Sequence, residues 1–479
     1  MAKDQASHLS LRRRCYLLLL LSFFSSFLFV CWSYFSNGCH TDVQIVVEAD
    51  KRESNLLAFQ AAWNSLQLPS GAPSRLLKLA VFVKKWPDKH HAGGLERHAM
   101  TLHRDLARRG HELHVFTSAS TNVTSMKNLH FHLSKPTAAG YLDQATIWKQ
   151  FQVENSTGRP FDVVHTESVG LMHFRARNLN NIAVSWHGIA YESIHSDIIQ
   201  ELLRAPQDNQ SSILAERVTK VIEEIRFFPR YAHHVATSDH VGDVLKRIYM
   251  LPEERVHIIL NGVDEGIFKP EASNLKLAFG IQESTSLILG IAGRLVKDKG
   301  HPLIFEALKQ IFNESLKFKE DVVVLVAGDG PWGDRYKELG SNLRVLGPLD
   351  QAQLTKFYNV IDIFVNPTLR AQGLDHTLLE AMLVGKPLMA TKLASITGSV
   401  VVSQEIGYMF SPTVDALKKA LYDVWKDGRV TLQKKGQFAR ERALKLFTAT
   451  KMTAAYERLF LCIAENTKVR NGYCTYRYN

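Results

Sequence analysis

A strand–helix–strand pattern at the start of the globular region restricts this chain to a small set of folds. The apolar run at 76–83 predicts a buried strand, and apolar residues at i, i+4, i+7 and i+11 from Leu95 predict a helix over 95–109. A second strand is predicted at 112–117. Two strands joined by a helix in this way form a βαβ unit, which requires a parallel sheet.

The alternation continues along the chain and then starts again. Further strands are predicted at 161–165, 182–185, 234–237 and 255–260. After Ser286 a new series has strands at 287–292, 322–327, 343–346 and 362–366, and helices at 302–312, 333–339, 351–358 and 376–384. Two successive series predict two α/β domains, 76–270 and 271–445. A helical stretch at 430–463 is long enough to return to the first domain, so 446–479 is predicted as a crossing helix and tail.

The N-terminal part predicts a membrane anchor. Residues 1–14 end in three arginines, and 15–35 carry no charge. At about 1.5 Å per residue this segment spans roughly 31 Å, close to a bilayer core of about 30 Å. No small-residue cleavage site is evident, and the arginines favour a cytoplasmic tail at 1–14. We therefore expect a type II signal anchor at 15–35, a lumenal stem at 36–75 and a lumenal body. The Golgi membrane is the expected location, with the endoplasmic reticulum as second choice.

Sequons and cysteines fit a lumenal body without fixing it. The sequons begin at Asn122, Asn155, Asn209 and Asn313. Outside the predicted anchor the cysteines are Cys39, Cys462 and Cys474, so one disulfide can form and its pairing stays open.

The formal charge of +11 does not indicate nucleic-acid binding. No basic block follows the arginines of the tail, and no motif interleaves aromatic and basic residues. The excess is interpreted as a solvated basic surface with local phosphate sites. The pairs His90-His91 and His233-His234 lack further ligands at zinc spacing, so no metal site is predicted.

Five features follow predicted strands, where parallel sheets bind their ligands. They are Gly93-Gly94, His187-Gly188, Gly293-Arg294 with Lys299-Gly300, Gly328 to Pro331, and Glu380. Their shared position, more than any one of them, indicates a functional site.

Two of these features suit phosphate. Gly93 and Gly94 let the backbone approach closely, and the following helix offers free N–H groups, although an ordinary tight turn would look the same. Arg294 has a rigid fork of donors for phosphate oxygens, and Lys299 adds a point charge. The alternative for both cations is an ordinary surface position.

Two others, Glu380 and His187, suit a sugar. Asp375 can cap a helix that carries Glu380, and a carboxylate can accept two hydrogen bonds from vicinal hydroxyls. His187 can hydrogen-bond a sugar hydroxyl or stabilise charge, although a lone histidine is often structural. Phosphate and hydroxyl partners together indicate a nucleotide sugar.

Six motifs carry a resemblance to a known family. In chain order they are GGLERHAMTLHRDLARRGHELHVFT, SWHG, NGVD, GRLVKDKG, AGDGP and GLDHTLLEAMLVGKP. Over residues 76–461 the chain resembles glycosyltransferase family 4, with a likeness to a little-characterised plant Golgi branch. The resemblance implies a retaining, nucleotide-sugar-dependent enzyme with the GT-B fold, in which two Rossmann-like domains face a cleft.

The resemblance also implies roles for single residues. Arg294 and Lys299 would bind the diphosphate, and Gly94 would approach it from the first domain. Glu380 would accept hydrogen bonds from the ribose, and His187 would touch the donor sugar near its anomeric carbon. The implied catalytic set consists of His187, Arg294, Lys299 and Glu380. The implied donor site further includes Gly93, Gly293, Leu346 near the base, Gln372, Gly373 and Leu374.

The resemblance implies no cofactor and no metal, and no Asp-x-Asp triplet follows a predicted strand. The co-substrate would be a UDP- or GDP-linked sugar, and the acceptor a glycan, lipid or small molecule. Oligomeric state, donor and acceptor stay open.

One position departs from the family. Gln372 stands where the family carries a glutamate that contacts the donor sugar. An amide can still hydrogen-bond a sugar, but it gives less electrostatic help to positive charge at the anomeric carbon. A non-catalytic nucleotide-sugar-binding or partner-binding protein is therefore the alternative. A nucleotide-sugar epimerase is a second rival, for which no acid–base pair can be assigned.

Overall fold

The computed structural model describes residues 71–87, 93–118, 126–204, 206–207, 209–271, 276–282, 285–370 and 374–466. The chain divides into two compact units, 1–60 and 61–479, and every described residue belongs to the second. The predicted tail, the anchor at 15–35 and most of the stem lie outside the described residues. None of the helices within those residues has the length and apolar character needed to cross a bilayer.

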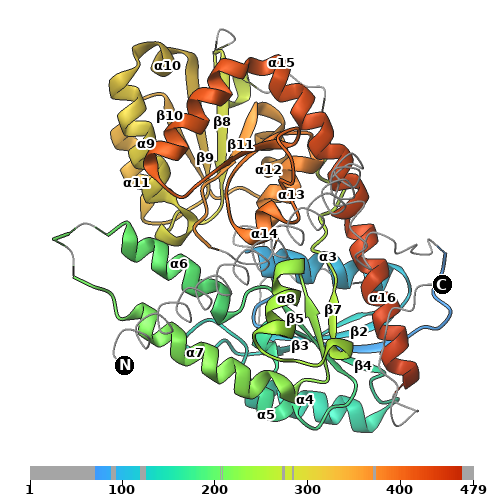
Figure 1. The fold of residues 1–479 in the computed structure, drawn as a ribbon. Coiled ribbons are helices and arrows are strands. Elements are labelled where there is room, and N and C mark those ends of the chain that lie inside the picture. The colour runs from blue at the N-terminus through green and yellow to red at the C-terminus, as the bar shows by residue number, and fades with distance from the viewer. Residues whose placement is uncertain are drawn as a thin grey trace, which may run out of the picture. The chain divides into compact units, whose positions relative to one another are not determined.

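Within the described residues, the first sheet has seven parallel strands in the order β3-β2-β1-β4-β5-β6-β7 (Figure 1). They are β1 (Lys78–Phe82), β2 (Glu112–Ser118), β3 (Leu129–Ser134), β4 (Val163–Glu167), β5 (Ile182–Trp186), β6 (His233–Ala236) and β7 (Val256–Ile258). The helices between them include α3 (Gly94–Arg108), α4 (Gln144–Thr157), α5 (His173–Ala176), α6 (Ala190–Leu202), α7 (Ile213–Phe227) and α8 (Asp239–Arg247). All five residues of β1 are buried, as expected for a parallel strand covered on both faces.

The second sheet has six parallel strands in the described part of the chain, in the order β10-β9-β8-β11-β12-β13. They are β8 (Leu287–Ala292), β9 (Val322–Ala327), β10 (Leu343–Gly347), β11 (Ile363–Asn366), β12 (Leu388–Thr391) and β13 (Gly407–Phe410). Its helices include α9 (His301–Glu314), α10 (Leu316–Asp321), α11 (Trp332–Tyr336), α12 (Gln351–Val360), α13 (His376–Leu383) and α14 (Ala394–Thr397). Each sheet has its own apolar core, so the chain folds as two Rossmann-like domains.

The C-terminal helices return to the first sheet. α15 (Val414–Leu446) is interrupted at Gly428, whose φ of 67° favours glycine, and α16 (Ala449–Asn466) packs on α3 and β4. The single stretch predicted at 430–463 is thus two helices. They separate because Val263 donates to the Phe447 carbonyl at 2.9 Å and accepts from the Ala449 N–H at 2.9 Å. The loop after β7 therefore holds the crossing point.

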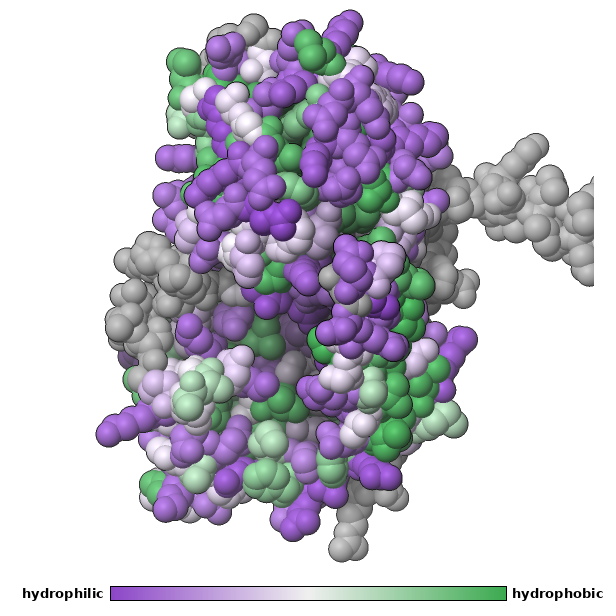
Figure 2. All heavy atoms as spheres, turned by 90° about the vertical axis from the view of Figure 1, so that its left-hand side faces the viewer, coloured by the Kyte–Doolittle hydropathy of each residue, from purple (hydrophilic) through white to green (hydrophobic). Residues whose placement is uncertain are grey.

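The structure also bears on the predicted disulfide and on the predicted cleft. Cys462 on α16 is disulfide-bonded, and the other four cysteines lie outside the described residues, so the pairing stays open. Figure 2 shows a face of the molecule that is hollowed at mid-height, with hydrophilic residues around the hollow.

Candidate active site

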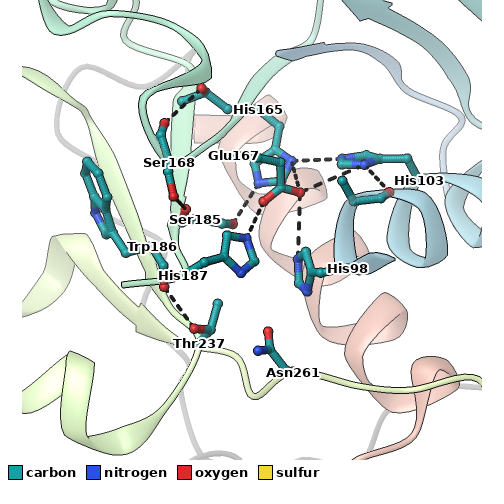
Figure 3. Close-up of polar contacts among 12 residues, drawn as sticks. His98, His103, His165, Glu167, Ser168, Ser185, Trp186, His187, Thr237 and Asn261 are labelled. Atoms are coloured by element: carbon teal, nitrogen blue, oxygen red, sulfur yellow. Dashed lines mark hydrogen bonds and ion pairs between the residues drawn. The ribbon is translucent and has the colours of Figure 1, made fainter. Parts of the chain in front are cut away.

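One end of the first sheet gathers a carboxylate and four imidazoles (Figure 3). Glu167 is the last residue of β4, and His165 lies two positions earlier, so both side chains leave the strand on the same face. His98 and His103 come from α3, and His187 follows β5. All of these side chains are buried except that of His187, which is 9% exposed.

Glu167 lies among these rings and is hydrogen-bonded to one of them. Its Oε2 accepts a hydrogen bond from Nε2 of His187 at 2.6 Å. Its Oε1 lies 3.7 Å from Nε2 of His98, 4.0 Å from Nδ1 of His103 and 3.9 Å from Nδ1 of His165, all beyond hydrogen-bond range. Burial opposes ionisation, but the neighbouring imidazoles hold the pKa of Glu167 well below its usual range. Burial lowers the pKa of His98 and His103, and it lowers the pKa of His165 to about 3.

Two of the rings belong to a continuous chain of hydrogen bonds. Nδ1 of His103 donates to the Ala99 carbonyl at 2.6 Å, because a carbonyl can only accept. Nε2 of His103 therefore accepts from Nδ1 of His165 at 2.9 Å, which leaves Nε2 of His165 to accept from the Ser185 hydroxyl at 2.8 Å. Tyr456 of α16 donates to Ser185 at 2.7 Å. Both rings are neutral and hydrogen-bonded at both nitrogens, so they stabilise the fold.

Other buried polar atoms nearby have no partner. Among the described residues, both ring nitrogens of His98, Oε1 of Glu167, Oδ1 of Asn261 and Nε2 of His376 make no hydrogen bond. The His98 ring lies 4.4 Å from that of His187 and 6.2 Å from that of His376, centre to centre. Asn261 follows β7 and donates to the Leu374 carbonyl at 2.9 Å. Because buried polar atoms normally have partners, this group marks a place where a ligand or an ordered water would bind.

The first turns of α3 and α13 meet at this place. A methyl group on Gly94 would lie 3.3 Å from Nδ1 of His376, and one on Gly93 would lie 2.5 Å from the carboxylate of Glu96. No side chain caps α3, so its first N–H groups stay available. Gly94 of the first domain therefore lies beside His376 of the second, and its approach to a diphosphate stays a prediction.

Lys299 reaches the same junction from the second domain. Its Nζ lies 2.7 Å from Oδ2 of Asp375, the N-cap of α13. Asp375 also accepts from the Thr377 N–H at 3.2 Å and from the Thr377 hydroxyl at 3.0 Å. Burial opposes ionisation of Asp375, but Lys299 and Thr377 hold its pKa well below the usual range. The predicted phosphate ligand is thus already paired with a carboxylate.

Arg294 follows β8, at the end of that strand where the site was predicted. Its carbonyl accepts from Nε2 of His301 at 3.0 Å, and its guanidinium has no hydrogen-bond or ion-pair partner among the described residues. The loop is tight, because a methyl group on Gly328 would lie 1.8 Å from the carbonyl oxygen of Gly293. Gly293 itself has a φ of 134°, which favours glycine.

Glu380 joins the two domains. Its Oε1 lies 2.6 Å from Nη1 of Arg97 on α3, and its Oε2 accepts from the Tyr358 hydroxyl at 2.8 Å. Burial raises the pKa of Glu380 against the opposing charge of Arg97. Both carboxylate oxygens are engaged and the side chain is 1% exposed, so a ribose would have to displace these partners.

Three further predicted residues are less informative. Leu346 lies on β10, the outermost strand on its side of the second sheet as described. Gln372 and Gly373 lie outside the described residues, so their roles stay predictions.

The sequence reasoning missed several residues of this junction. Arg97, His98, Glu167, Asn261 and His376 were not singled out as site residues. His98 was detectable, because it flanks the apolar stripe of α3 that includes Ala99. Glu167 was detectable as the polar end of a strand, yet the strand was expected to end at His165. It runs two residues further because Thr166 and Glu167 pair with β5.

Comparison with family models matches both domains. A model described as Glycosyltransferase Family 4 matches residues 92–266, and one described as Glycosyl transferases group 1 matches residues 286–427. An uncharacterized glycosyltransferase of Methanocaldococcus jannaschii is 23% identical over 340 residues, which cover 67% of this chain and 82% of that one. N-acetyl-alpha-D-glucosaminyl L-malate synthase of Bacillus anthracis is 23% identical over 407 residues, covering 82% and 99%.

Solved structures share the fold. Sucrose-phosphate synthase from Thermosynechococcus elongatus has a TM-score of 0.65 at 18% identity and covers 81% of this chain and 100% of its own. Anabaena HepE in complex with UDP-glucose has a TM-score of 0.56 at 17% identity and covers 82% and 99%. The two parallel-sheet domains form a GT-B fold, and the chain belongs to glycosyltransferase family 4.

Proposed function

We propose that the protein transfers a sugar from a nucleotide diphosphate sugar to an acceptor hydroxyl, with retention of configuration. The observation that carries this proposal is the meeting of the first turns of α3 and α13, one from each domain, at Gly94 and His376. Unpaired buried polar atoms lie at this junction, and so does Lys299, which pairs with Asp375 beside His376. A ligand with hydroxyls at one end and phosphates at the other matches that arrangement.

The diphosphate would bind Arg294, Lys299 and the uncapped N–H groups of α3. An uncapped helix N-terminus attracts anions, and the Arg294 fork can bind two phosphate oxygens at once. These groups would stabilise the charge that develops on the leaving nucleotide. Asp375 competes for Lys299, so it would share or release this side chain when phosphate binds.

The donor sugar would lie toward His187. Glu167 holds the His187 ring through Nε2, so the other ring nitrogen is free to meet a sugar hydroxyl. The negative charge of Glu167 would favour positive charge at the anomeric carbon. In the proposed mechanism the acceptor attacks the face from which the nucleotide leaves, and the departing phosphate takes the acceptor proton. The protein binds and orients both partners.

Anabaena HepE has been solved with UDP and with UDP-glucose, which supports a nucleotide sugar as donor. The choice between UDP and GDP stays open. From the sequence alone we also propose that residues 15–35 anchor the protein in the Golgi membrane with a lumenal body, and that the endoplasmic reticulum is the second choice.

Turnover of a donor panel tests the proposal. The full-length protein in detergent is incubated with UDP- and GDP-linked sugars and a mixture of glycan, lipid and small-molecule acceptors. We expect one donor to release its nucleoside diphosphate, and NMR of the product to show the anomeric configuration of the donor. An inverted product would contradict retention. Tight binding of a donor without hydrolysis or transfer would favour the non-catalytic alternative suggested by Gln372.

A further inference from the structure

Two ion pairs join the loop after β8 to the loop after β11, and each loop supplies one cation and one carboxylate to them. Lys299, after β8, pairs with Asp375, after β11, at 2.7 Å. Arg370, after β11, pairs with Asp298, after β8, at 3.3 Å. The Leu369 N–H also donates to the Asp298 carbonyl at 3.0 Å. The two loops are therefore fixed to each other beside the proposed diphosphate site.

The ion pair with Asp298 leaves the hydrogen-bond donors of Arg370 unused. Among the described residues the Arg370 guanidinium donates no hydrogen bond, and its contact with Asp298 is an ion pair alone. An arginine has five N–H donors in a planar fork. The Arg370 side chain is 26% exposed, so a ligand can reach these donors. Like Arg294, whose guanidinium is also without a partner in the described part of the chain, Arg370 therefore has donors to offer a ligand.

Arg370 lies where the two domains face each other. The short 3-10 helix Lys297–Lys299, which contains Asp298, contacts α6 of the first domain. Burial lowers the pKa of the Arg370 guanidinium, and the positive charge of Arg294 lowers it further. The carboxyl of Glu192 on α6 acts on this pKa in the opposite direction. Because such effects require nearby charges, Arg370 lies close to Arg294 in its own domain and to Glu192 in the other.

We propose that Arg370 is a third cation for the diphosphate, beside Arg294 and Lys299. Asp298 orients the Arg370 side chain until phosphate oxygens replace the carboxylate as its partner. This role rests on the proposed function. Three cations and the carboxylates of Asp298 and Asp375 leave one excess positive charge, which attracts an anion. The two guanidinium forks can each bind two phosphate oxygens, and the ammonium group adds a point charge.

Calorimetry of diphosphate binding tests this role. The full-length protein in detergent is titrated with UDP and with GDP, and the variants with whichever of the two binds more tightly. Arg370→Ala should bind it about tenfold more weakly, because charge-assisted hydrogen bonds to phosphate are lost. Arg370→Lys keeps the charge but loses the fork, so its affinity should lie between those of the wild type and Arg370→Ala.

Arg429→Ala is the matched control. Arg429 pairs with Asp362 at 3.2 Å and is 32% exposed, so its ion pair resembles that of Arg370 in length and exposure. Asp362 directly precedes β11, whereas Arg370 follows it, so the control pair lies at the opposite end of the same strand. Arg429→Ala should therefore bind the diphosphate as the wild type does. An equal loss of affinity in Arg429→Ala and Arg370→Ala would mean that a weakened fold, and not a lost ligand, lowers the affinity, and would overturn the proposal.

Asp298→Asn separates binding of phosphate from support of the loop, and it keeps the proposal testable if Arg370→Ala does not fold. The amide has the size of the carboxylate and leaves the backbone hydrogen bond from Leu369, but it no longer competes for the Arg370 charge. The diphosphate should therefore bind several-fold tighter, and this gain should disappear in the double variant Asp298→Asn/Arg370→Ala. Weaker binding in Asp298→Asn, or a gain that persists in the double variant, would overturn the proposal.

The role of Arg370 and the proposed function fail in different ways. A wild type that binds neither UDP nor GDP would contradict both of them. A wild type that binds one diphosphate, together with an unchanged affinity in Arg370→Ala, would contradict only the role of Arg370 and leave the proposed function standing.

Discussion

Arg97 and Glu380 form an ion pair that joins the two domains, with 2.6 Å between Nη1 and Oε1. Arg97 lies on α3 of the first domain and Glu380 on α13 of the second. The two side chains are 11% and 1% exposed, so solvent screens the pair little. Glu380 therefore connects the domains in this structure, in addition to its predicted role toward ribose.

Loss of Arg97 should destabilise the protein strongly. Arg97→Ala leaves the Glu380 carboxylate buried with Tyr358 as its remaining partner, which should cost about 3–5 kcal/mol. The cost appears as a lower free energy of unfolding in chemical denaturation. Arg335→Ala is the matched control, because Arg335 is half-exposed and its ion pair with Glu338 lies on the surface, where its guanidinium also covers the rings of Phe305 and Trp332. Equal stability of Arg97→Ala and Arg335→Ala would contradict a buried, unscreened pair.

A double variant separates the charge from the packing. Glu380→Gln removes the unpaired charge that Arg97→Ala leaves, so the double variant should be more stable than Arg97→Ala alone. A double variant that is less stable would mean that packing, and not charge, dominates at this contact.

Asp375 should limit the affinity for nucleoside diphosphate. Asp375→Asn keeps an oxygen to cap α13 but removes the negative charge that holds Lys299, so the diphosphate should bind about tenfold tighter. Lys299→Ala should bind it about tenfold more weakly. Calorimetry with the preferred diphosphate measures both. Weaker binding in Asp375→Asn would show that the carboxylate positions Lys299 for phosphate and does not compete with it.

Stability should fall as pH rises because of Glu192. Burial raises the pKa of this α6 carboxyl to about 8, so the folded protein keeps a proton that the unfolded chain loses near its ordinary pKa. The contribution is complete below about pH 4.5 and is lost between about pH 5 and 8, at up to about 1.4 kcal/mol per pH unit. Glu192→Gln mimics the protonated form, so its unfolding free energy should depend less on pH there. Identical slopes for both proteins would refute the assignment.

Glycosylation at Asn209 would report a lumenal body. Asn209 is exposed between α6 and α7 and begins the sequon Asn-Gln-Ser. In a eukaryotic secretory host, Asn209→Gln and Ser211→Ala should each lose the mass of one glycan on a gel, whereas Gln210→Ala keeps the sequon and the mass. Equal mobility of all four proteins would remove this support for the lumenal orientation.

The fold was largely predictable because its strands are continuous apolar runs. The strands expected at 287–292 and 322–327 are β8 and β9, with the same bounds, since each run is buried and ends at a glycine. β3 was missed because His130 and His132 interrupt its apolar pattern, and the structure uses them beside His114. A contact between polar side chains of two different strands cannot be recognised from a single sequence.

The site was predictable in its position more than in its partners. Arg294 and Lys299 were singled out because they follow a strand and lie between glycines, and their role toward phosphate stays a prediction. His98 and Glu167 lie 69 residues apart in the sequence, and only the packing of α3 on the sheet brings them together. The pairing of Lys299 with Asp375 depends on the same kind of long-range contact, at 2.7 Å.

Binding of nucleoside diphosphates, followed by thermal shift, tests the central claim most directly. Wild type and the double variant Arg294→Ala/Lys299→Ala are compared with UDP and GDP, with Arg335→Ala as surface control. One diphosphate should raise the melting temperature of wild type and of Arg335→Ala, because ligand binding stabilises the folded state by mass action. The double variant should show no shift. The same shift in the double variant, or no shift with either diphosphate in the wild type, would contradict a diphosphate site built on Arg294 and Lys299.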